Sequence, residues 1–208
     1  MITSALRQGW DAWAELGSGL RAEQWVRTTR LDGWTVKDVY AHCCWAPWFF
    51  GEVAQEAHAP TGPVTHARAS EVLAEMQASG GIAHTFADDI RQHAIDGADK
   101  HSTTELTEQF RTAAPRVLQQ LEALDPSFAV DYGGMAVIPL GEALRITLLE
   151  AVVHYFDIAA ALDFPRPGPV SGAPLAQTVE LLAEIADPVA FVDHATGRST
   201  APVFPVLR

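Results

Sequence analysis

LLEAVVHYFDIA, residues 148–159, is the stretch of sequence that decides the fold. Apolar residues recur every three or four positions around it, from about residue 140 to residue 162, which predicts one long helix. The predicted buried face comprises Leu144, Leu148, Ala151, Val152, Tyr155, Ile158 and Ala159. Glu150 lies among apolar neighbours in this helix, and a carboxylate in such surroundings needs a charged partner or a cation.

A second helix is predicted from Thr35 onward. Thr35 is a favourable N-cap, and Asp38 three residues later completes a pattern like a capping box. His42 lies on the apolar stripe that follows. Pro47 cannot donate to the carbonyl of Cys43, so we expect a kink one turn after His42.

The remaining pattern is also mainly helical. We predict a mainly α fold, an antiparallel four-helix bundle with helical insertions and a short C-terminal appendage. Further helices are expected at about residues 3–20, 67–78, 82–94, 105–124 and 175–186. Thr103 or Thr104 is the expected N-cap of the fourth of these, which Pro115 interrupts. Residues 125–140 are expected to be irregular and residues 191–208 extended.

Composition and charge exclude several classes of protein. The chain has 208 residues, 48% of them apolar, with a net charge of −12. A folded core is therefore expected, and an acidic surface repels nucleic acid and anionic membranes. No apolar run approaches the roughly 18 residues of a membrane span, and charged residues stand where a signal peptide would be apolar, so we expect a cytoplasmic protein. The adjacent Cys43 and Cys44 are expected to be free buried thiols.

The chemistry of the chain is expected on the two predicted helices. Glu150 and His154 are four residues apart and therefore leave one face of their helix. A third ligand from a facing helix, His42, would give a His2Glu set, which leaves a coordination position for water or substrate. The alternative is that each histidine is an ordinary core residue with satisfied hydrogen bonds. Asp157 lies on the same stripe and could orient His154, accept a proton, or simply be a solvated acid.

Two segments resemble a known family. Residues 25–42, WVRTTRLDGWTVKDVYAH, are similar to the N-terminal signature of the mycothiol-dependent maleylpyruvate isomerase family, within the DinB-like superfamily. Residues 148–159 are similar to its second signature, a Glu, three residues, a His, two residues and an Asp. The resemblance implies a four-helix bundle with a divalent ion held by His42, Glu150 and His154. It implies zinc first, with nickel, iron or manganese as alternatives, a low-molecular-weight thiol such as mycothiol as cosubstrate, and an acidic position beside the site at Asp157.

The chain also departs from this family. Thr28 and Asp32 stand where prolines are usual, and Tyr155-Phe156 replaces a common Gly-Trp. We expect residues 1–165 to form the metal-binding helical bundle and residues 166–208 to form a Pro/Gly-rich linker and appendage that packs on it. The family's isomerase has a second α/β domain that supplies a basic residue, and Arg198 cannot be matched to it, so the substrate stays open.

Three functions remain open from the sequence. The first is a metal-dependent, thiol-using isomerase or S-transferase, with Asp157 as the catalytic residue. The second is a metal hydrolase that uses bound water, and the third is a non-catalytic bundle that binds a metal or a small molecule. The expected partner is a small-molecule substrate, without nucleic acid or membrane, and a homodimer is an alternative to a monomer. Trp45 and Trp48 are candidates for an aromatic pocket wall. The other histidines are expected at the surface: His58, His66, His84, His93, His101 and His194.

Overall fold

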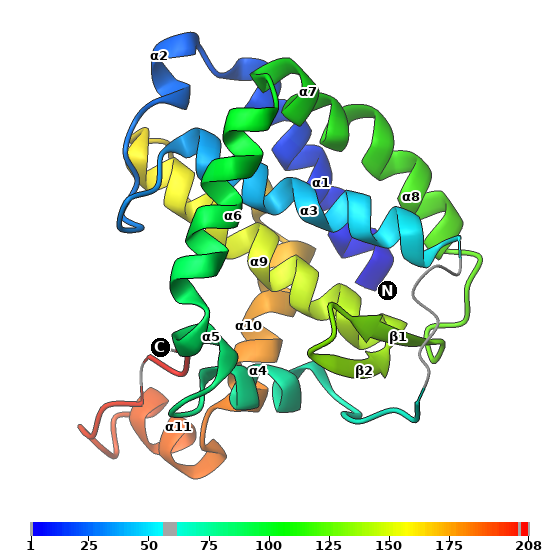
Figure 1. The fold of residues 1–208 in the computed structure, drawn as a ribbon. Coiled ribbons are helices and arrows are strands. Elements are labelled where there is room, and N and C mark those ends of the chain that lie inside the picture. Colours follow the sequence, from blue (N-terminus) through cyan, green and yellow to red (C-terminus); the bar gives the residue numbers. More distant parts are fainter. Residues whose placement is uncertain (1, 56–61, 204, 208) are drawn as a thin grey trace.

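The computed structural model describes residues 2–55, 62–203 and 205–207 (Figure 1). The fold is mainly α, as predicted, and carries a small two-stranded sheet. Its elements follow in chain order: α1 (Ile2–Gly19), α2 (Ala22–Trp25), α3 (Val36–Val53), α4 (Ala69–Gln77), α5 (Ile82–Thr85), α6 (Ala87–Lys100), α7 (Thr103–Glu108), the π-helix η1 (Gln109–Ala113), α8 (Ala114–Leu121), β1 (Ala129–Tyr132), β2 (Ala136–Pro139), α9 (Leu140–Ala161), the 3₁₀-helix η2 (Gly168–Val170), α10 (Ala173–Ile185) and α11 (Pro188–Ala195).

The start of α3 confirms the predicted capping pair. The Asp38 backbone N–H donates to Thr35 Oγ1 at 3.3 Å, and the Thr35 backbone N–H donates to Asp38 Oδ2 at 2.7 Å. These two bonds satisfy donors that the first turn of a helix leaves free. The helix continues through Pro47 to Val53. The N-cap of α3 thus lies seven residues before His42.

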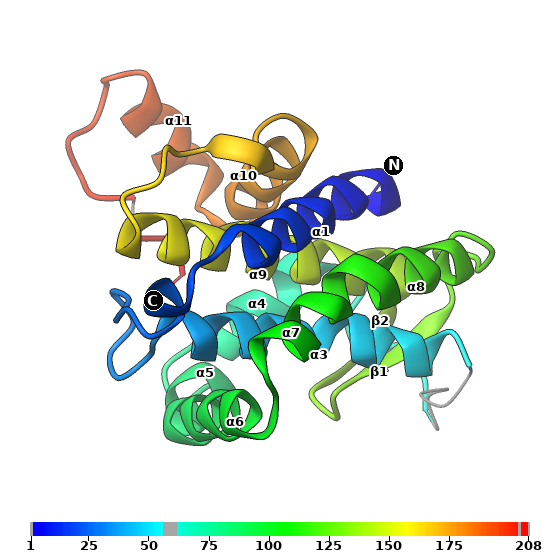
Figure 2. The ribbon, with the colours of Figure 1, turned by 90° about the horizontal axis from the view of Figure 1, so that it is seen from above.

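The helices α1, α3, α9 and the run from α7 to α8 pack against one another. Figure 2 shows α9 between α10 on one side and α3 on the other, with α6 on the outer side of α3. Two buried hydrogen bonds join three of these helices: the Trp13 indole N–H donates to the Ala151 carbonyl at 3.0 Å, and the Tyr40 hydroxyl donates to the Trp13 carbonyl at 2.8 Å. Trp13, Tyr40 and Phe110 also pack ring against ring in the core. This core fixes α3 and α9 relative to each other.

The run from α7 to α8 differs from prediction in its cap and its middle. Ser102, not Thr103 or Thr104, is the N-cap, and it forms a capping box with Glu105. The predicted interruption lies just before Pro115, where the chain widens into η1 before α8 begins. A proline has no N–H for the carbonyl one turn earlier, so regular α-helical bonding fails there.

The sequence predicted that residues 125–140 are irregular, but the structure has two strands within this segment. β1 and β2 form an antiparallel hairpin in which Val130 pairs with Ile138 and Tyr132 with Ala136. Gly133 and Gly134, in the three-residue turn between the paired Tyr132 and Ala136, both adopt positive φ, 64° and 73°, which glycine allows without strain. The hairpin leads directly into the first residue of α9.

The C-terminal segment is more helical than predicted. α11 occupies part of residues 191–208, where extended chain was expected; Phe204 and Arg208 lie outside the described residues. α10 packs on α1, α4 and α9, and α11 contacts α10. The proposed boundary at residues 165 and 166 stays a prediction. Throughout the described part of the chain, no helix combines the length and the apolar character needed to cross a membrane.

Candidate metal centre

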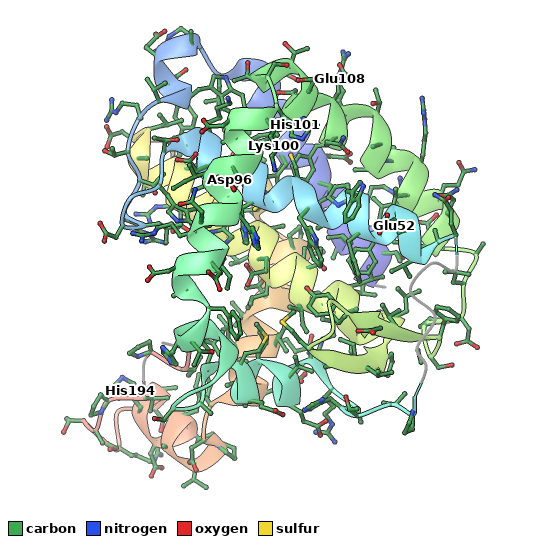
Figure 3. The ribbon with its side chains drawn as sticks, viewed as in Figure 1. Glu52, Asp96, Lys100, His101, Glu108 and His194 are labelled. Carbon is green, nitrogen blue, oxygen red and sulfur yellow. The ribbon has the colours of Figure 1, made fainter. Side chains whose placement is uncertain are left out.

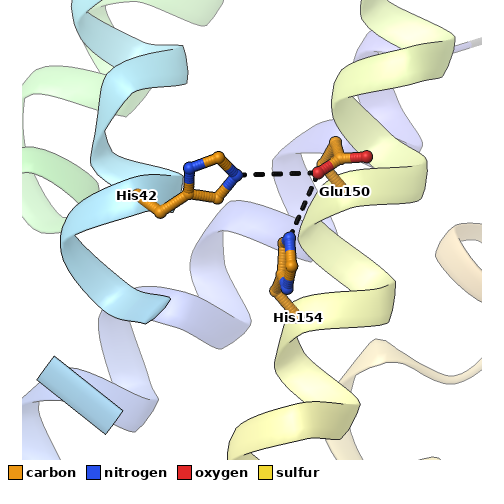
Figure 4. A group of neighbouring side chains, drawn as sticks. All are labelled: His42, Glu150 and His154. Carbon is orange, nitrogen blue, oxygen red and sulfur yellow. Dashed lines mark ion pairs between the residues drawn. The ribbon is translucent and has the colours of Figure 1, made fainter. Parts of the chain in front are cut away.

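Three side chains from two helices converge between α3 and α9 (Figure 4). α3 supplies His42, and α9 supplies Glu150 and His154 from successive turns of one face. Glu150 Oε2 lies 3.7 Å from His42 Nε2 and 3.2 Å from His154 Nε2. One nitrogen or oxygen atom from each residue lies within 4.8 Å of the others. The structure therefore brings together all three residues that the sequence singled out as ligands.

The separations of the Glu150 oxygen from the two histidine nitrogens fit one divalent ion. Two ligand atoms about 2.1 Å from a tetrahedral zinc ion are about 3.4 Å apart, and the two measured separations lie close to this value. Two imidazoles and one carboxylate are donors that zinc and its neighbours in the first transition row accept. The donor set and the spacing thus both suit such an ion.

One side of the cluster is open to solvent. The Glu150 side chain is 44% exposed and that of His42 is 29% exposed, whereas that of His154 is only 13% exposed. A set of three protein ligands that solvent can reach has room for an exchangeable fourth ligand. This arrangement is typical of catalytic sites and differs from closed structural ones.

The charges of the cluster are strongly coupled in the metal-free protein. Desolvation raises the pKa of Glu150, but the interactions with His154 and His42 outweigh it and hold that pKa well below its ordinary value. Desolvation lowers the pKa of His154, while its hydrogen bonds with Asp157 and Glu150 raise it to about 9. Glu150 is therefore ionised and His154 is protonated near neutral pH. Binding a divalent ion there would release the proton on His154 Nε2.

Asp157 lies behind His154, away from the atoms that would face an ion. Its Oδ2 lies 2.8 Å from His154 Nδ1, and its side chain is only 2% exposed. Its other oxygen, Oδ1, accepts a hydrogen bond of 2.6 Å from Nε of Arg30. Burial raises the pKa of Asp157, but the contacts with His154 and Arg30 give a net lowering. An ionised carboxylate only accepts hydrogen bonds, so Nδ1 of His154 must carry the proton that is donated to it.

Trp34 packs against both imidazoles. Its ring centroid lies 5.2 Å from that of His42 in an edge-on arrangement and 6.2 Å from that of His154 in a stacked one. Trp34 is 8% exposed. The ring therefore covers one side of the histidine pair and restricts how both imidazoles turn.

Sequence reasoning missed the roles of Arg30 and Trp34, although both lie in the first family signature. Helical periodicity cannot relate either residue to a candidate ligand, because the connector between α2 and α3 is irregular. A signal was nevertheless present: a carboxylate on the buried stripe of α9 requires a partner, and Arg30 lies near the start of α3.

Two tryptophans on α3 were also candidates for the site. Trp45 and Trp48 are 40% and 55% exposed; Trp45 stacks on Phe49 at 4.5 Å. Their role as a pocket wall stays a prediction.

The two cysteines are free and buried, as predicted. Burial raises the pKa of both thiols, and the Cys44 thiol lies 3.4 Å from the Leu106 carbonyl. Both thiols are therefore protonated near neutral pH, which makes them poor nucleophiles.

The remaining histidines are mostly at the surface, as predicted. His101 and His194, which Figure 3 labels at the end of α6 and on α11, are exposed, as are His84 and His93. His66 departs from this prediction because its ring pairs with Glu75 at 2.7 Å and is 20% exposed. His58 lies outside the described residues.

Comparison with known proteins supports the family resemblance. The family model of the mycothiol maleylpyruvate isomerase N-terminal domain matches residues 6–159, which include the whole of α3 and all the residues of the cluster. No curated protein and no solved structure gives a significant match.

Proposed function

The chain belongs to the mycothiol maleylpyruvate isomerase N-terminal domain family, and we propose that it is a divalent-metal-dependent enzyme. In this proposal it activates a low-molecular-weight thiol, such as mycothiol, for isomerisation or S-transfer on a small molecule. The observation that carries the proposal is the convergence of His42, Glu150 and His154 on one partly exposed point. This donor set is one of those found in catalytic zinc sites.

His42, Glu150 and His154 would hold the ion. A divalent ion at such a position supplies Lewis acidity, which lowers the pKa of a thiol or a water molecule by several units. The carboxylate of Glu150 contributes the negative charge of the ligand set. The 44% exposure of this side chain leaves a route by which a small thiol and its electrophile can reach the ligands.

We assign Asp157 a positioning role. The sequence predicted it as the catalytic residue, either orienting His154 or accepting a proton. Both of its oxygens are engaged, one with His154 and one with Arg30, and it is 2% exposed. This favours the first alternative: Asp157 fixes the tautomer of His154 and leaves Nε2 free for the ion, as partners of metal-binding histidines commonly do.

The same proposal covers the type of helical bundle, the metal, the substrate, the location and the domain bounds. The packing of α1, α3, α9 and the α7–α8 run supports an antiparallel four-helix bundle of the DinB-like type. Zinc is the proposed metal, a small molecule the proposed substrate, and the cytoplasm the proposed location. The bundle would span residues 1–165, with residues 166–208 as its appendage.

Metal analysis of the purified protein tests the ligand set. We expect about one divalent ion per chain in the wild type, and losses of affinity above ~100-fold in His154→Ala and His42→Ala, because removing a ligand costs more than the 10–100-fold typical of its outer partners. His93→Ala, an exposed histidine on α6, is the matched control and should bind like the wild type. Equal binding by all four proteins would refute the site.

Turnover with and without a thiol tests the reaction. The metal-loaded protein should accelerate the isomerisation of maleylpyruvate, or thiol transfer to an aryl halide, only when mycothiol or another small thiol is present. Hydrolysis of an ester without a thiol would instead support a metal hydrolase. Bound metal without turnover on any of these substrates would support a non-catalytic binding protein.

A further inference from the structure

Arg30 lies in the connector between α2 and α3, 127 residues from the carboxylate that it contacts. Its Nε donates to Asp157 Oδ1 at 2.6 Å, while the arginine side chain remains 54% exposed. We propose that Arg30 is a positioning residue of the metal centre, which acts through Asp157 on His154. This inference rests on the proposed function, because it assigns Arg30 to the support of a metal ligand.

The contacts form one continuous series from the connector to the ligand atoms. Arg30 Nε binds one oxygen of Asp157, the other oxygen binds Nδ1 of His154 at 2.8 Å, and Nε2 of His154 lies 3.2 Å from Glu150. The terminal torsion of an aspartate has a broad range of allowed angles, so one hydrogen bond leaves the carboxylate plane poorly fixed. A second bond to the opposite oxygen fixes it. Arg30 therefore sets the angle at which Asp157 meets the imidazole.

The connector does not need the Arg30 side chain to keep its shape. The Thr29 backbone N–H donates to the Trp34 carbonyl at 2.9 Å, and the Val36 backbone N–H donates to the Arg27 carbonyl at 2.9 Å. Thr28 and Thr35 also form an antiparallel bridge. These bonds close the loop independently of the guanidinium. Replacing Arg30 should consequently change the support of Asp157 and leave the loop folded.

Arg27 offers an internal comparison. It lies in the same connector, and its Nη2 donates to the Ala161 carbonyl at the end of α9, at 3.1 Å. Both arginines thus attach the connector to α9, but only Arg30 reaches the carboxylate behind His154. An effect on the metal centre that is shared by both would indicate simple attachment, whereas an effect specific to Arg30 indicates positioning.

The test measures zinc affinity of the full-length protein by competition with a chromophoric chelator. We expect Arg30→Met to weaken binding about three- to tenfold, below the 10–100-fold typical of direct partners of a ligand. Arg30→Lys should recover part of the loss, because it restores a cation but not the planar guanidinium. Arg27→Met should bind like the wild type, and circular dichroism should show the same helix content in all variants.

A double-mutant cycle makes the test specific. In an Asp157→Asn background, Arg30→Met should have no further effect on zinc affinity, since Arg30 acts only through Asp157. The downfield proton resonance of His154 Nδ1–H in the metal-free protein gives a second readout, and it should shift or broaden in Arg30→Met but not in Arg27→Met.

Three results would overturn the inference: an unchanged affinity and resonance in Arg30→Met, an equal loss in Arg27→Met, or a full effect of Arg30→Met in the Asp157→Asn background. If the wild type binds zinc tightly, either of the first two results would refute the role of Arg30 and leave the proposed function standing. Absence of zinc binding by the wild type would instead refute the proposed function, and the resonance of His154 would then decide whether Arg30 positions this histidine at all.

Discussion

The two histidines of the cluster are held in different ways. On α9, His154 is 13% exposed, its Nδ1 is bonded to a buried carboxylate, and that carboxylate is bonded to Arg30. On α3, His42 is 29% exposed, and among the described residues its polar contact is Glu150 at 3.7 Å. His154 is thus fixed by a series of hydrogen bonds, whereas His42 is held by ring contacts with Trp34 and His154.

This difference indicates how the site would accept an ion. A ligand that is already oriented loses little conformational entropy on binding, whereas a freer one loses more. We therefore expect Glu150 and His154 to form the preorganised part of the site, and His42 to complete it with a small rotation of its ring.

The largest effect that separates the two histidines is the pH dependence of stability without metal. The pKa of His154 is raised to about 9 in the folded protein, from an ordinary value of 6.5. A group with a raised pKa stabilises the fold fully below its unfolded value, and this stabilisation is lost as the pH rises through the folded value. Urea unfolding should thus show a decrease on the order of 3 kcal/mol between about pH 6.5 and pH 9.

Two variants identify the histidine responsible for this decrease. His154→Gln should remove most of it, because glutamine does not titrate in this range. His42→Gln removes one neighbour of Glu150 but leaves the Asp157 contact of His154, and should therefore keep most of the decrease. If the two variants reduced the pH dependence of stability equally, the proposed difference between His154 and His42 would be wrong.

The second effect concerns the buried carboxylate on α9. Asp157→Asn puts an amide where His154 Nδ1 now finds an oxygen that only accepts hydrogen bonds. We expect zinc affinity to decrease about 10–100-fold, the range typical for partners of metal-binding histidines. Isothermal titration with the metal-free protein measures this loss.

Asp89→Asn, at an exposed position on α6, is the control for the change in charge. If Asp157→Asn bound zinc as tightly as Asp89→Asn, the support behind His154 would have no part in ligation, and the two histidines would be equivalent in this respect.

The three candidate ligands could be named from the sequence because each lies on a regular helix. The helix around residues 140–162 and the cap at Thr35 were read from periodicity and from capping chemistry, and both are confirmed. The spacing of four residues then put Glu150 and His154 on one face. Periodicity does not show which helices face each other, so the assignment of His42 to the same point rested on its place on an apolar stripe and was strengthened by the family resemblance.

Other features could not be read so directly. β1 and β2 have only four residues each, too few for an alternating pattern to stand out. The contact of Arg30 with Asp157 joins residues 127 apart through an irregular connector. For α11 a signal was present and missed: Asp187 caps the Ala190 N–H at 2.7 Å, and Pro188 occupies the first helical position.

The smallest effect that tests the comparison concerns Trp34. Its ring contacts that of His42 at 5.2 Å between centroids, beside the contact of His42 with His154 at 5.1 Å, whereas His154 is also held by its hydrogen bond with Asp157. Trp34→Phe keeps an aromatic core residue and reduces the contact area, so His42 gains rotamer freedom that must be lost again on binding. Ordering one side chain costs about 0.5–1 kcal/mol, so zinc affinity should decrease roughly two- to fivefold.

Trp48, which lies on α3 and is 55% exposed, provides the control. Trp48→Phe should leave the zinc affinity unchanged. Asp157 contacts His154, whereas Trp34 packs against both imidazoles. Losses that add in the double variant would assign the effect of Trp34 to His42, and a loss far from additive would mean that the two halves of the site are held as one unit.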